Sequence, residues 1–205
     1  MELDPLKVLG RNRDDLSFLL SGVGPVEAAM NLTDFLARDQ QRKISAVINV
    51  GIGGAYPDSD LNPLDVCLAD HEVFADIGVA LGDTIEELDK SFSPPLEFSL
   101  DQDLLSKAAT GLNKAAIEFK RGNFITVSAA SGTTSRSRYL RDKFSAICEN
   151  MEGAAIARVC QKFSLPSLEL RCISNMVVDR KEQHWLTKEA VAGCGRALQA
   201  VMEVL

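Results

Sequence analysis

Short apolar runs alternate with amphipathic segments along most of this 205-residue chain. Nearly continuous apolar runs are typical of strands covered on both faces, whereas apolar residues spaced three or four apart predict helices. The strand-like runs cover residues 15–21, 44–50, 66–74, 124–128 and 167–174. The helix-like segments cover residues 25–38, 104–119, 151–163 and 187–205. This alternation predicts an α/β fold in which helices cover both faces of one sheet.

The ends of the expected strands carry most of the unusual residues. Pro25 suits the first turn of a helix and Thr187 is a plausible cap of the last helix, whereas residues 82–100 look like a surface excursion. In open α/β sheets, ligands bind outside the carboxyl ends of the strands. A tight turn is the plainer interpretation of a glycine cluster at such an end. We expect functional residues at four strand ends, which are residues 22–25, 51–54, 128–134 and 174–175.

Composition restricts the class of partner. With 46% apolar and 25% charged residues the chain can bury one core, so a single domain is expected. The net charge of -7 argues against nucleic acid and anionic membranes, because phosphate-binding surfaces need clustered Lys and Arg. No apolar run reaches the about 18 residues of a membrane span. The five cysteines lack a CxxC spacing and there are only two histidines, so we expect reduced thiols, no metal site and a cytoplasmic protein.

One carboxylate stands in a segment where charge is costly. Glu152 lies among small and apolar residues at the head of an expected helix, and burying a carboxylate without partners is unfavourable. Interaction with the helix dipole is the plainer explanation. Nineteen residues later, Arg171 opens a segment that continues to Ser174 and Asn175 at the end of an apolar strand. Together these side chains predict a site for a polyhydroxyl ring that carries a hydrogen-bonding base.

Four motifs resemble, in order and spacing, those of the nucleoside phosphorylase/hydrolase superfamily. They are SGVGPVEAA at residues 21–29, NVGIGGA at 49–55, NMEGAA at 150–155 and RCISN at 171–175. Within this superfamily the chain looks most like the futalosine hydrolases of the alternative menaquinone pathway, and less like the methylthioadenosine/S-adenosylhomocysteine nucleosidases. The choice depends on three features: ENMEG at 149–153, ISN at 173–175 followed by Asp179, Arg180 and Trp185, and FADIG at 74–78.

The resemblance implies a single three-layer α/β/α domain over residues 1–205, with a central mixed, largely parallel twisted sheet. It also implies a purine nucleoside and water as partners, no cofactor, and a homodimer. Cleavage of an N-glycosidic bond develops positive charge on the ribose and negative charge on the purine. By resemblance, Glu152 would bind the 2′- and 3′-hydroxyls, Met151 would pack on the sugar or base, and Arg171 would orient the carboxylate or the water. The remaining substrate-binding residues that it implies are Gly53, Gly54, Asn150 and Ser174.

Asn175 departs from the adenine-cleaving members of the superfamily, which resemble one another in having aspartate here. Asparagine has no titratable proton, but its amide can donate to a 6-oxo group while its carbonyl accepts from a developing N7–H. That pattern fits hypoxanthine, the base of futalosine, and mismatches adenine. The alternative is that Asn175 only closes a turn after a strand.

The nucleophile is expected to be water rather than phosphate. Ile52 stands where a hydroxyl would help to bind an anion, and residues 22–25 contain no arginine. Neither glycine cluster matches GxGxxG, and the chain has no P-loop motif. Arg136 and Arg138 could still reach an anion from their loop, although a solvated polar face is the plainer interpretation.

The start of the chain differs from the superfamily, which opens with a buried strand that leads to a water-activating glutamate. The resemblance places Glu2 in that catalytic position, with Asp4 as the alternative, and the family's first strand would be lacking. Two other functions stay open. One is a methylthioadenosine/S-adenosylhomocysteine nucleosidase, and the other is a catalytically inactive purine-nucleoside-binding protein.

Overall fold

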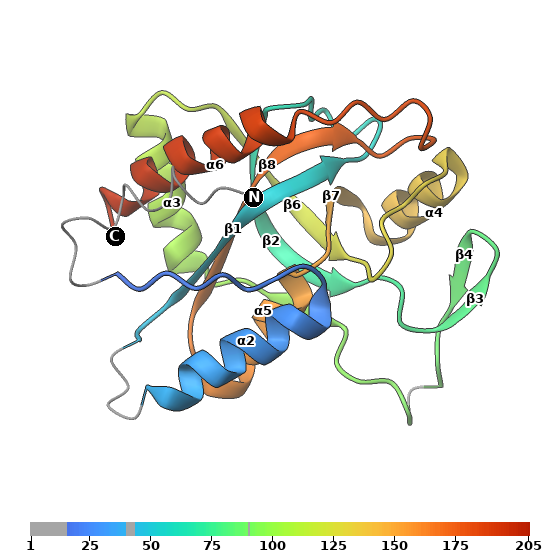
Figure 1. Ribbon diagram of the computed structural model, residues 1–205, viewed down its shortest axis with the longest axis horizontal. Helices are drawn as coiled ribbons and strands as arrows, with labels where there is room; N and C mark the ends of the chain where they lie inside the picture. Colours follow the sequence, from blue (N-terminus) through green and yellow to red (C-terminus); the bar gives the residue numbers. More distant parts are fainter. Residues whose placement is uncertain (1–15, 40–43, 90) are drawn as a thin grey trace.

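A computed structural model describes residues 16–39, 44–89 and 91–205, and its main element is one mixed sheet (Figure 1). The strands follow the order β5-β2-β6-β7-β1-β8, and β8 also pairs with β2, so that β2, β6, β7, β1 and β8 form a closed ring. Pairing is parallel for β1–β8, β2–β6 and β6–β7, and antiparallel for β1–β7, β2–β5 and β2–β8. The strands are β1 (Val47–Ala55), β2 (Val66–Phe74), β5 (Glu97–Ser99), β6 (Phe119–Thr126), β7 (Ala146–Asn150) and β8 (Ser167–Met176).

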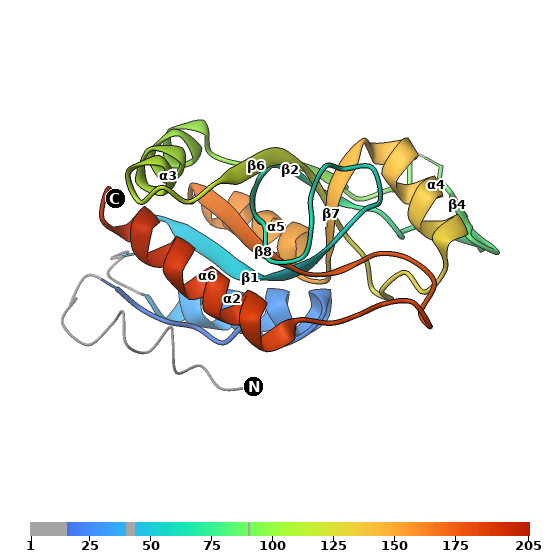
Figure 2. The same cartoon turned by 90° about the horizontal axis from the view of Figure 1, so that it is seen from above.

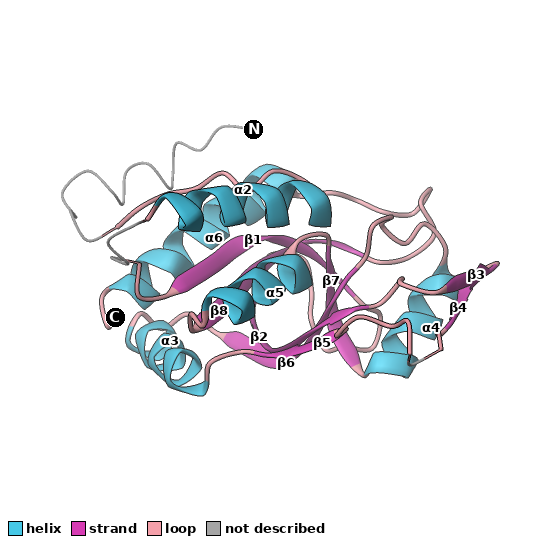
Figure 3. Ribbon diagram, turned by 90° about the horizontal axis from the view of Figure 1, so that it is seen from below, coloured by secondary structure: helices cyan, strands magenta, loops and turns pink. Residues whose placement is uncertain are grey.

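Helices cover the sheet in two groups, as the alternating pattern predicts. Helix α2 (Pro25–Arg38) packs on α5 (Gly153–Phe163), which contacts β2 and β6, and Figure 3 shows this pair from below. Helix α3 (Gln102–Lys114) packs on α6 (Thr187–Met202), which contacts β1 and β8; Figure 2 shows α6 from above. Helix α4 (Thr134–Phe144) contacts β7. The predicted α/β fold with a central mixed sheet is confirmed.

The main core lies between the sheet and the α3–α6 pair. Its fully buried side chains come from both strands and helices, which ties the two layers together. Burial of each such leucine or phenylalanine contributes roughly 1.5–3 kcal/mol to folding. The largest members of this cluster are Leu68, Leu105, Leu112, Phe124, Leu168, Leu170 and Ile173.

Residues 15–21 were expected to form a buried strand, and this prediction is wrong for the described part, 16–21. These residues form an irregular segment in which Phe18 is 48% exposed and Leu20 is 60% exposed. A strand needs a neighbouring strand to take up its backbone hydrogen bonds. Among the residues that the structure describes, no strand pairs with this segment.

The glycine cluster at residues 51–54 is not the turn that its composition suggests. Strand β1 begins at Val47 rather than at residue 44, and it continues through the glycines to Ala55. Close packing explains their small size: a Cβ on Gly51 would lie 2.6 Å from Arg171 Nη1, and one on Gly54 would lie 2.7 Å from Val177 Cγ2. The glycines therefore let other side chains approach the strand.

Other elements also differ from expectation: the helix expected over residues 104–119 ends at Lys114, and β6 already begins at Phe119. The presumed excursion over residues 82–100 includes β4 (Thr84–Glu86), which pairs with β3 (Val79–Leu81), and β5, which joins the main sheet. The α6 helix begins after Leu186 without a side-chain cap, so the capping role of Thr187 is wrong. Strand β7 was not predicted, because its five residues are too few to show a period.

Candidate active site

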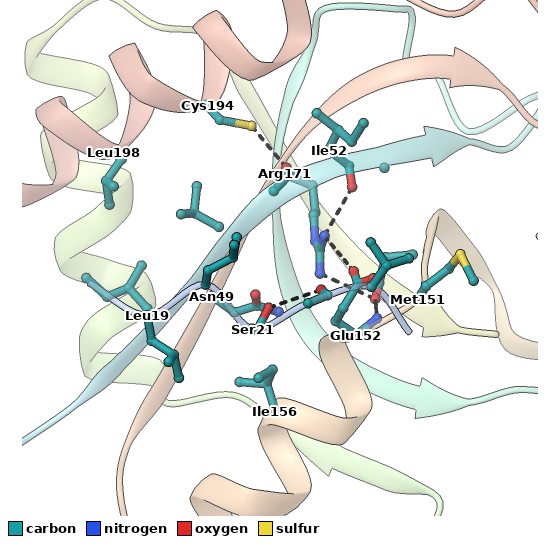
Figure 4. Close-up of a pocket in the computed structure, with 18 of the residues that line it drawn as sticks. Leu19, Ser21, Asn49, Ile52, Met151, Glu152, Ile156, Arg171, Cys194 and Leu198 are labelled. Carbon is teal, nitrogen blue, oxygen red and sulfur yellow. Dashed lines mark hydrogen bonds and ion pairs between the residues drawn. The ribbon is translucent and has the colours of Figure 1, made fainter. Parts of the chain in front are cut away.

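A cavity of about 760 Å³ opens beside β1 and is lined by residues of the segment 16–23 and of helices α2 and α6; Figure 4 shows part of this lining. Glu152 and Arg171 form a polar end, and Leu19, Ile156 and Leu198 line an apolar part. The predicted site residues within the described chain all line this cavity; they are Gly53, Gly54, Asn150, Met151, Glu152, Arg171, Ser174 and Asn175. The remaining candidate, Glu2, and its alternative, Asp4, lie outside the described residues.

Parallel pairing of β1 with β8 brings distant motifs together. Gly54 is the register partner of Asn175, and Gly51 is the partner of Arg171. Gly53 pairs with Ile173 and Gly54 with Asn175, so the register shift between the two glycines places both Ser174 and Asn175 against the glycine run. Residues more than a hundred positions apart thus share one wall of the cavity.

Glu152 stands immediately before α5, but its carboxylate does not cap that helix. Oε1 accepts a hydrogen bond from the Gly24 N–H at 3.0 Å, and Oε2 lies 3.3 Å from Arg171 Nη1. The side chain is 15% exposed and lines the cavity. Each carboxylate oxygen can accept a further hydrogen bond, so the group can still bind the hydroxyls of a ligand.

Asn150 performs the capping instead. Its Oδ1 accepts hydrogen bonds from the backbone N–H groups of Glu152 at 2.9 Å and of Gly153 at 2.7 Å. The Nδ2 group donates to Glu72 Oε1. Most of the hydrogen-bonding capacity of Asn150 is therefore spent within the protein, and the residue holds the start of α5 in place.

Arg171 is buried, and its guanidinium group is hydrogen-bonded within the protein. Its Nε donates to Glu169 Oε1 at 2.8 Å, and its Nη1 donates to Ile52 O at 3.1 Å as well as pairing with Glu152. Burial opposes the positive charge, but Glu169 and then Glu152 outweigh it and raise the pKa of Arg171 above its ordinary value. The guanidinium is a permanent cation that orients carboxylates and cannot act as a proton donor.

Ser174 and Asn175 lie inside β8, so Asn175 does not close a turn as the plainer interpretation had it. Ser174 Oγ lies within donor distance of Gly53 O at 3.1 Å and of Asn175 Oδ1 at 2.8 Å. Asn175 Nδ2 donates to Met176 O at 3.2 Å. The amide is almost fully buried, and it keeps one N–H and one lone pair for a ligand.

The other two arginines that were candidates for anion binding lie outside the cavity lining. Arg136 pairs with Asp76 at 3.6 Å, and neither Arg136 nor Arg138 lines the cavity. Among the described residues that line it, Arg171 is the one cationic side chain. Trp185 also lines the cavity and is half-exposed, with its indole N–H donating to Gln183 Oε1 at 3.2 Å.

The roles of several buried polar residues in this region were not predicted from the sequence. Glu149 Oε2 accepts from Tyr56 OH at 2.7 Å and from Ser131 Oγ at 2.6 Å, which fixes the loop over residues 128–133 against the cavity. Burial, and then the charge of Glu149, raises the pKa of Tyr56. Glu72 and Glu169 are also buried. A charged residue inside an otherwise apolar strand is the signal that could have identified them.

Within the described ranges, no group of three or more His, Cys, Asp or Glu side chains could hold a metal ion. No helix of the described chain is long and apolar enough to cross a membrane. The five cysteines are free and buried.

Comparisons with known proteins agree on one family. The model of the "Phosphorylase superfamily" matches residues 9–205. A futalosine hydrolase from Thermus thermophilus is 33% identical over 195 residues, which cover 90% of this chain and 80% of that protein. A 5′-methylthioadenosine/S-adenosylhomocysteine nucleosidase from Staphylococcus haemolyticus is 28% identical over 167 residues, or 80% and 70% of the two chains. The solved structure of a futalosine hydrolase mutant from Helicobacter pylori has a TM-score of 0.81 at 20% identity, covering 99% of this chain and 94% of that one.

Proposed function

This chain belongs to the phosphorylase superfamily, and from that premise we propose that it hydrolyses the N-glycosidic bond of futalosine and releases hypoxanthine. The relative at 33% identity is a futalosine hydrolase, which supports this substrate. The reaction would then belong to the alternative menaquinone pathway. The five free, buried cysteines support the reducing, cytoplasmic location expected for it.

The observation that carries the proposal is the placement of Glu152. Its carboxylate is held between the Gly24 N–H and Arg171 at the polar end of a large cavity. A carboxylate with free lone pairs can accept hydrogen bonds from both the 2′- and the 3′-hydroxyl of a ribose. Its negative charge also favours the positive charge that develops on the sugar as the glycosidic bond breaks.

Asn175 supports hypoxanthine as the leaving base. Its free N–H can donate to a 6-oxo group, and its carbonyl can accept from N7–H as negative charge develops on the purine. Ser174 Oγ bonds to Asn175 Oδ1 and helps to keep the amide in one orientation. Adenine presents the opposite hydrogen-bonding pattern at position 6 and would leave a buried amide group unpaired.

The charge around the cavity supports water as the nucleophile. A phosphate ion would need several donors or cations, and Arg171, the one described cation of the lining, is already paired with Glu169 and Glu152. Glu2 remains our proposed water activator, with Asp4 as the alternative.

We also infer a homodimer. Val23, Val26 and Met30 are exposed apolar side chains around the start of α2, close to the loop that contacts Glu152. Exposed apolar surface of this kind is typical of a protein interface. Sedimentation at several protein concentrations tests this inference, and a monomer at all concentrations contradicts it.

A base-release assay tests the proposed activity. Purified protein is incubated with futalosine, methylthioadenosine and S-adenosylhomocysteine, and free hypoxanthine and adenine are separated by chromatography. Hypoxanthine from futalosine alone is the expected result. Release of adenine from the other two would favour the second candidate, the nucleosidase activity of the relative from Staphylococcus haemolyticus. Binding without release of any base would indicate an inactive nucleoside-binding protein.

A further inference from the structure

Two carboxyl groups face each other beneath the start of α5. Glu72 lies in β2 and is fully buried, and Glu169 lies in β8 with 1% of its surface exposed. Both lie beside Gly153, the first residue of α5: a Cβ at this position would collide with both Glu72 Oε1 and Glu169 Oε2. The absence of a side chain at Gly153 is what lets the two groups approach each other.

The partners of the two groups are unequal. Glu169 Oε1 accepts from the Arg171 guanidinium at 2.8 Å, whereas Glu72 receives only neutral donors, Thr126 Oγ1 at 2.9 Å and Asn150 Nδ2. Arg171 is already shared between Glu169 and Glu152. One cation therefore faces three carboxyl groups, of which Glu72 and Glu169 are closed to water, and an additional unpaired charge at these two is strongly unfavourable.

We propose that Glu72 and Glu169 share one proton across Gly153 and act as a positioning pair for Glu152, an inference that rests on the proposed role of Glu152 in binding ribose. Glu72 is the partner that holds the proton, because it has no cation of its own. Its Oε1 then donates toward Glu169 Oε2, while Asn150 Nδ2 donates to the same Glu72 oxygen. Burial raises the pKa of Glu72, and the charge of Glu169 raises it further.

Each member of the pair is linked to Glu152 by a chain of hydrogen bonds. From Glu72, the contact runs through Asn150, whose Oδ1 holds the backbone N–H of Glu152. From Glu169, it runs through Arg171, whose Nη1 holds the carboxylate of Glu152. The shared proton thus fixes both the backbone and the side chain of the residue that we assign to the ribose.

The surroundings of Glu72 identify what a change of pH would affect. The described residues that contact it or lie beside it are Thr126 from β6, Asn150 from β7, Glu169 and Arg171 from β8, Gly153 from α5, and its register partners Phe98 from β5 and Phe124 from β6. Glu169 and Arg171 are the charged members of this set. Loss of the shared proton at high pH leaves two carboxylates that repel each other, and this weakens the contacts through Asn150 and through Arg171.

Infrared difference spectroscopy tests the proton directly, without any substrate. The difference between the spectra of the wild type and of Glu72→Gln, both recorded at about pH 7, is expected to show the C=O stretch of a protonated carboxylic acid. The matched control, Glu97→Gln, removes an exposed carboxylate from the neighbouring strand β5 and is expected to show no such band. Absence of the band for Glu72 overturns the shared proton, whether or not the protein cleaves a nucleoside.

The pH dependence of unfolding provides a second test of the shared proton. A carboxyl group whose pKa is raised above the ordinary 4.5 contributes stability that is complete below that value and is lost as the pH rises through the folded-state pKa. Glu72→Gln is therefore expected to remove part of the fall in unfolding free energy above pH 4.5, whereas Glu97→Gln keeps it. An identical fall in wild type and Glu72→Gln contradicts the proposal.

Activity tests the positioning role. Glu72→Leu removes both hydrogen bonds and is expected to lower kcat/KM on the cleaved nucleoside by roughly tenfold or more, through displacement of Glu152. Glu72→Gln has no proton to lose and can donate an N–H toward Glu169, but its NH2 group cannot accept from Asn150 Nδ2, so it is expected to recover part of that loss and to extend activity to higher pH. If Glu72→Leu folds and is fully active, or if Glu72→Gln loses activity with rising pH just as the wild type does, the pair does not position the site. If wild type cleaves no nucleoside, the proposed function fails while the two preceding measurements still decide on the shared proton.

Discussion

Arg171 Nη1 lies 3.3 Å from Glu152 Oε2, and this ion pair joins the interior of β8 to the residue that precedes α5. The guanidinium is 4% exposed and the carboxylate 15% exposed. The carboxylate is therefore the part of the pair that a ligand can reach, while the arginine fixes its direction from behind. This division of roles leads to separate expectations for the two residues.

Replacing Glu152 by glutamine is expected to lower futalosine hydrolysis by at least about 100-fold, because charge-assisted bonds to the ribose hydroxyls are lost. Steady-state kinetics on the wild type and the variant provide the measurement. Glu118→Gln, which removes an exposed carboxylate that does not line the cavity, is the matched control and should keep wild-type rates. Full activity of Glu152→Gln would remove Glu152 from the site.

Replacing Arg171 by methionine should affect stability as well as rate. The change leaves Glu169 and Glu152 without their cation, and breaking a buried pair in this way costs about 3–5 kcal/mol. Urea unfolding measures the free energy, with Arg158→Met on the exposed face of α5 as the control. A loss below about 1 kcal/mol, the typical value for surface pairs, would mean that the buried network is not formed in solution.

Asn175 provides the sharpest test of the base. The wild type should cleave futalosine far better than an adenine counterpart, and Asn175→Asp should narrow or invert that preference by on the order of 100-fold. The carboxylate restores an acceptor for a 6-amino group and repels O6 unless it is protonated. Relative kcat/KM on the two nucleosides gives the answer, and Asn113→Asp at an exposed position controls for added charge. A preference that the substitution leaves untouched would show that Asn175 does not contact position 6.

Phosphate should neither accelerate the reaction nor appear in a product. The expectation follows from a cavity whose one described cation is already paired. Chromatography of the sugar product with and without added phosphate tests it. Detection of ribose 1-phosphate, or of the corresponding 5′-substituted sugar phosphate, would make the protein a phosphorylase.

Local patterns predicted the parts of the fold that local forces determine. The bounds of β2 were predicted residue for residue, and Pro25 was correctly placed at the start of α2. These segments have a clear apolar period or a residue with restricted backbone angles. The short strand β7 and the segment 16–21 were not predicted correctly, because strand formation depends on a partner far along the chain that no local window contains.

The same limit applies to the site. Glu152 and Arg171 were identified because charge stands out within small and apolar runs. Their supporting residues were not: Glu72 lies 97 positions before Glu169, and only the pairing of β2 with β8 brings their strands together. Asn150 was expected at the substrate and lines the cavity, but the capping of α5 by its side chain was not predicted, because that role depends on the path of the backbone after β7.

Gly153 links three positions that evolution cannot change independently. A side chain there would occupy the space of the two carboxyl oxygens, so a relative that carries alanine at this position has no room for the pair. Glutamates at 72 and 169 and glycine at 153 should therefore be inherited or lost together. Such a joint pattern would let sequences alone sort the members of this superfamily into those with and those without the buried pair, independently of the residue that contacts the base.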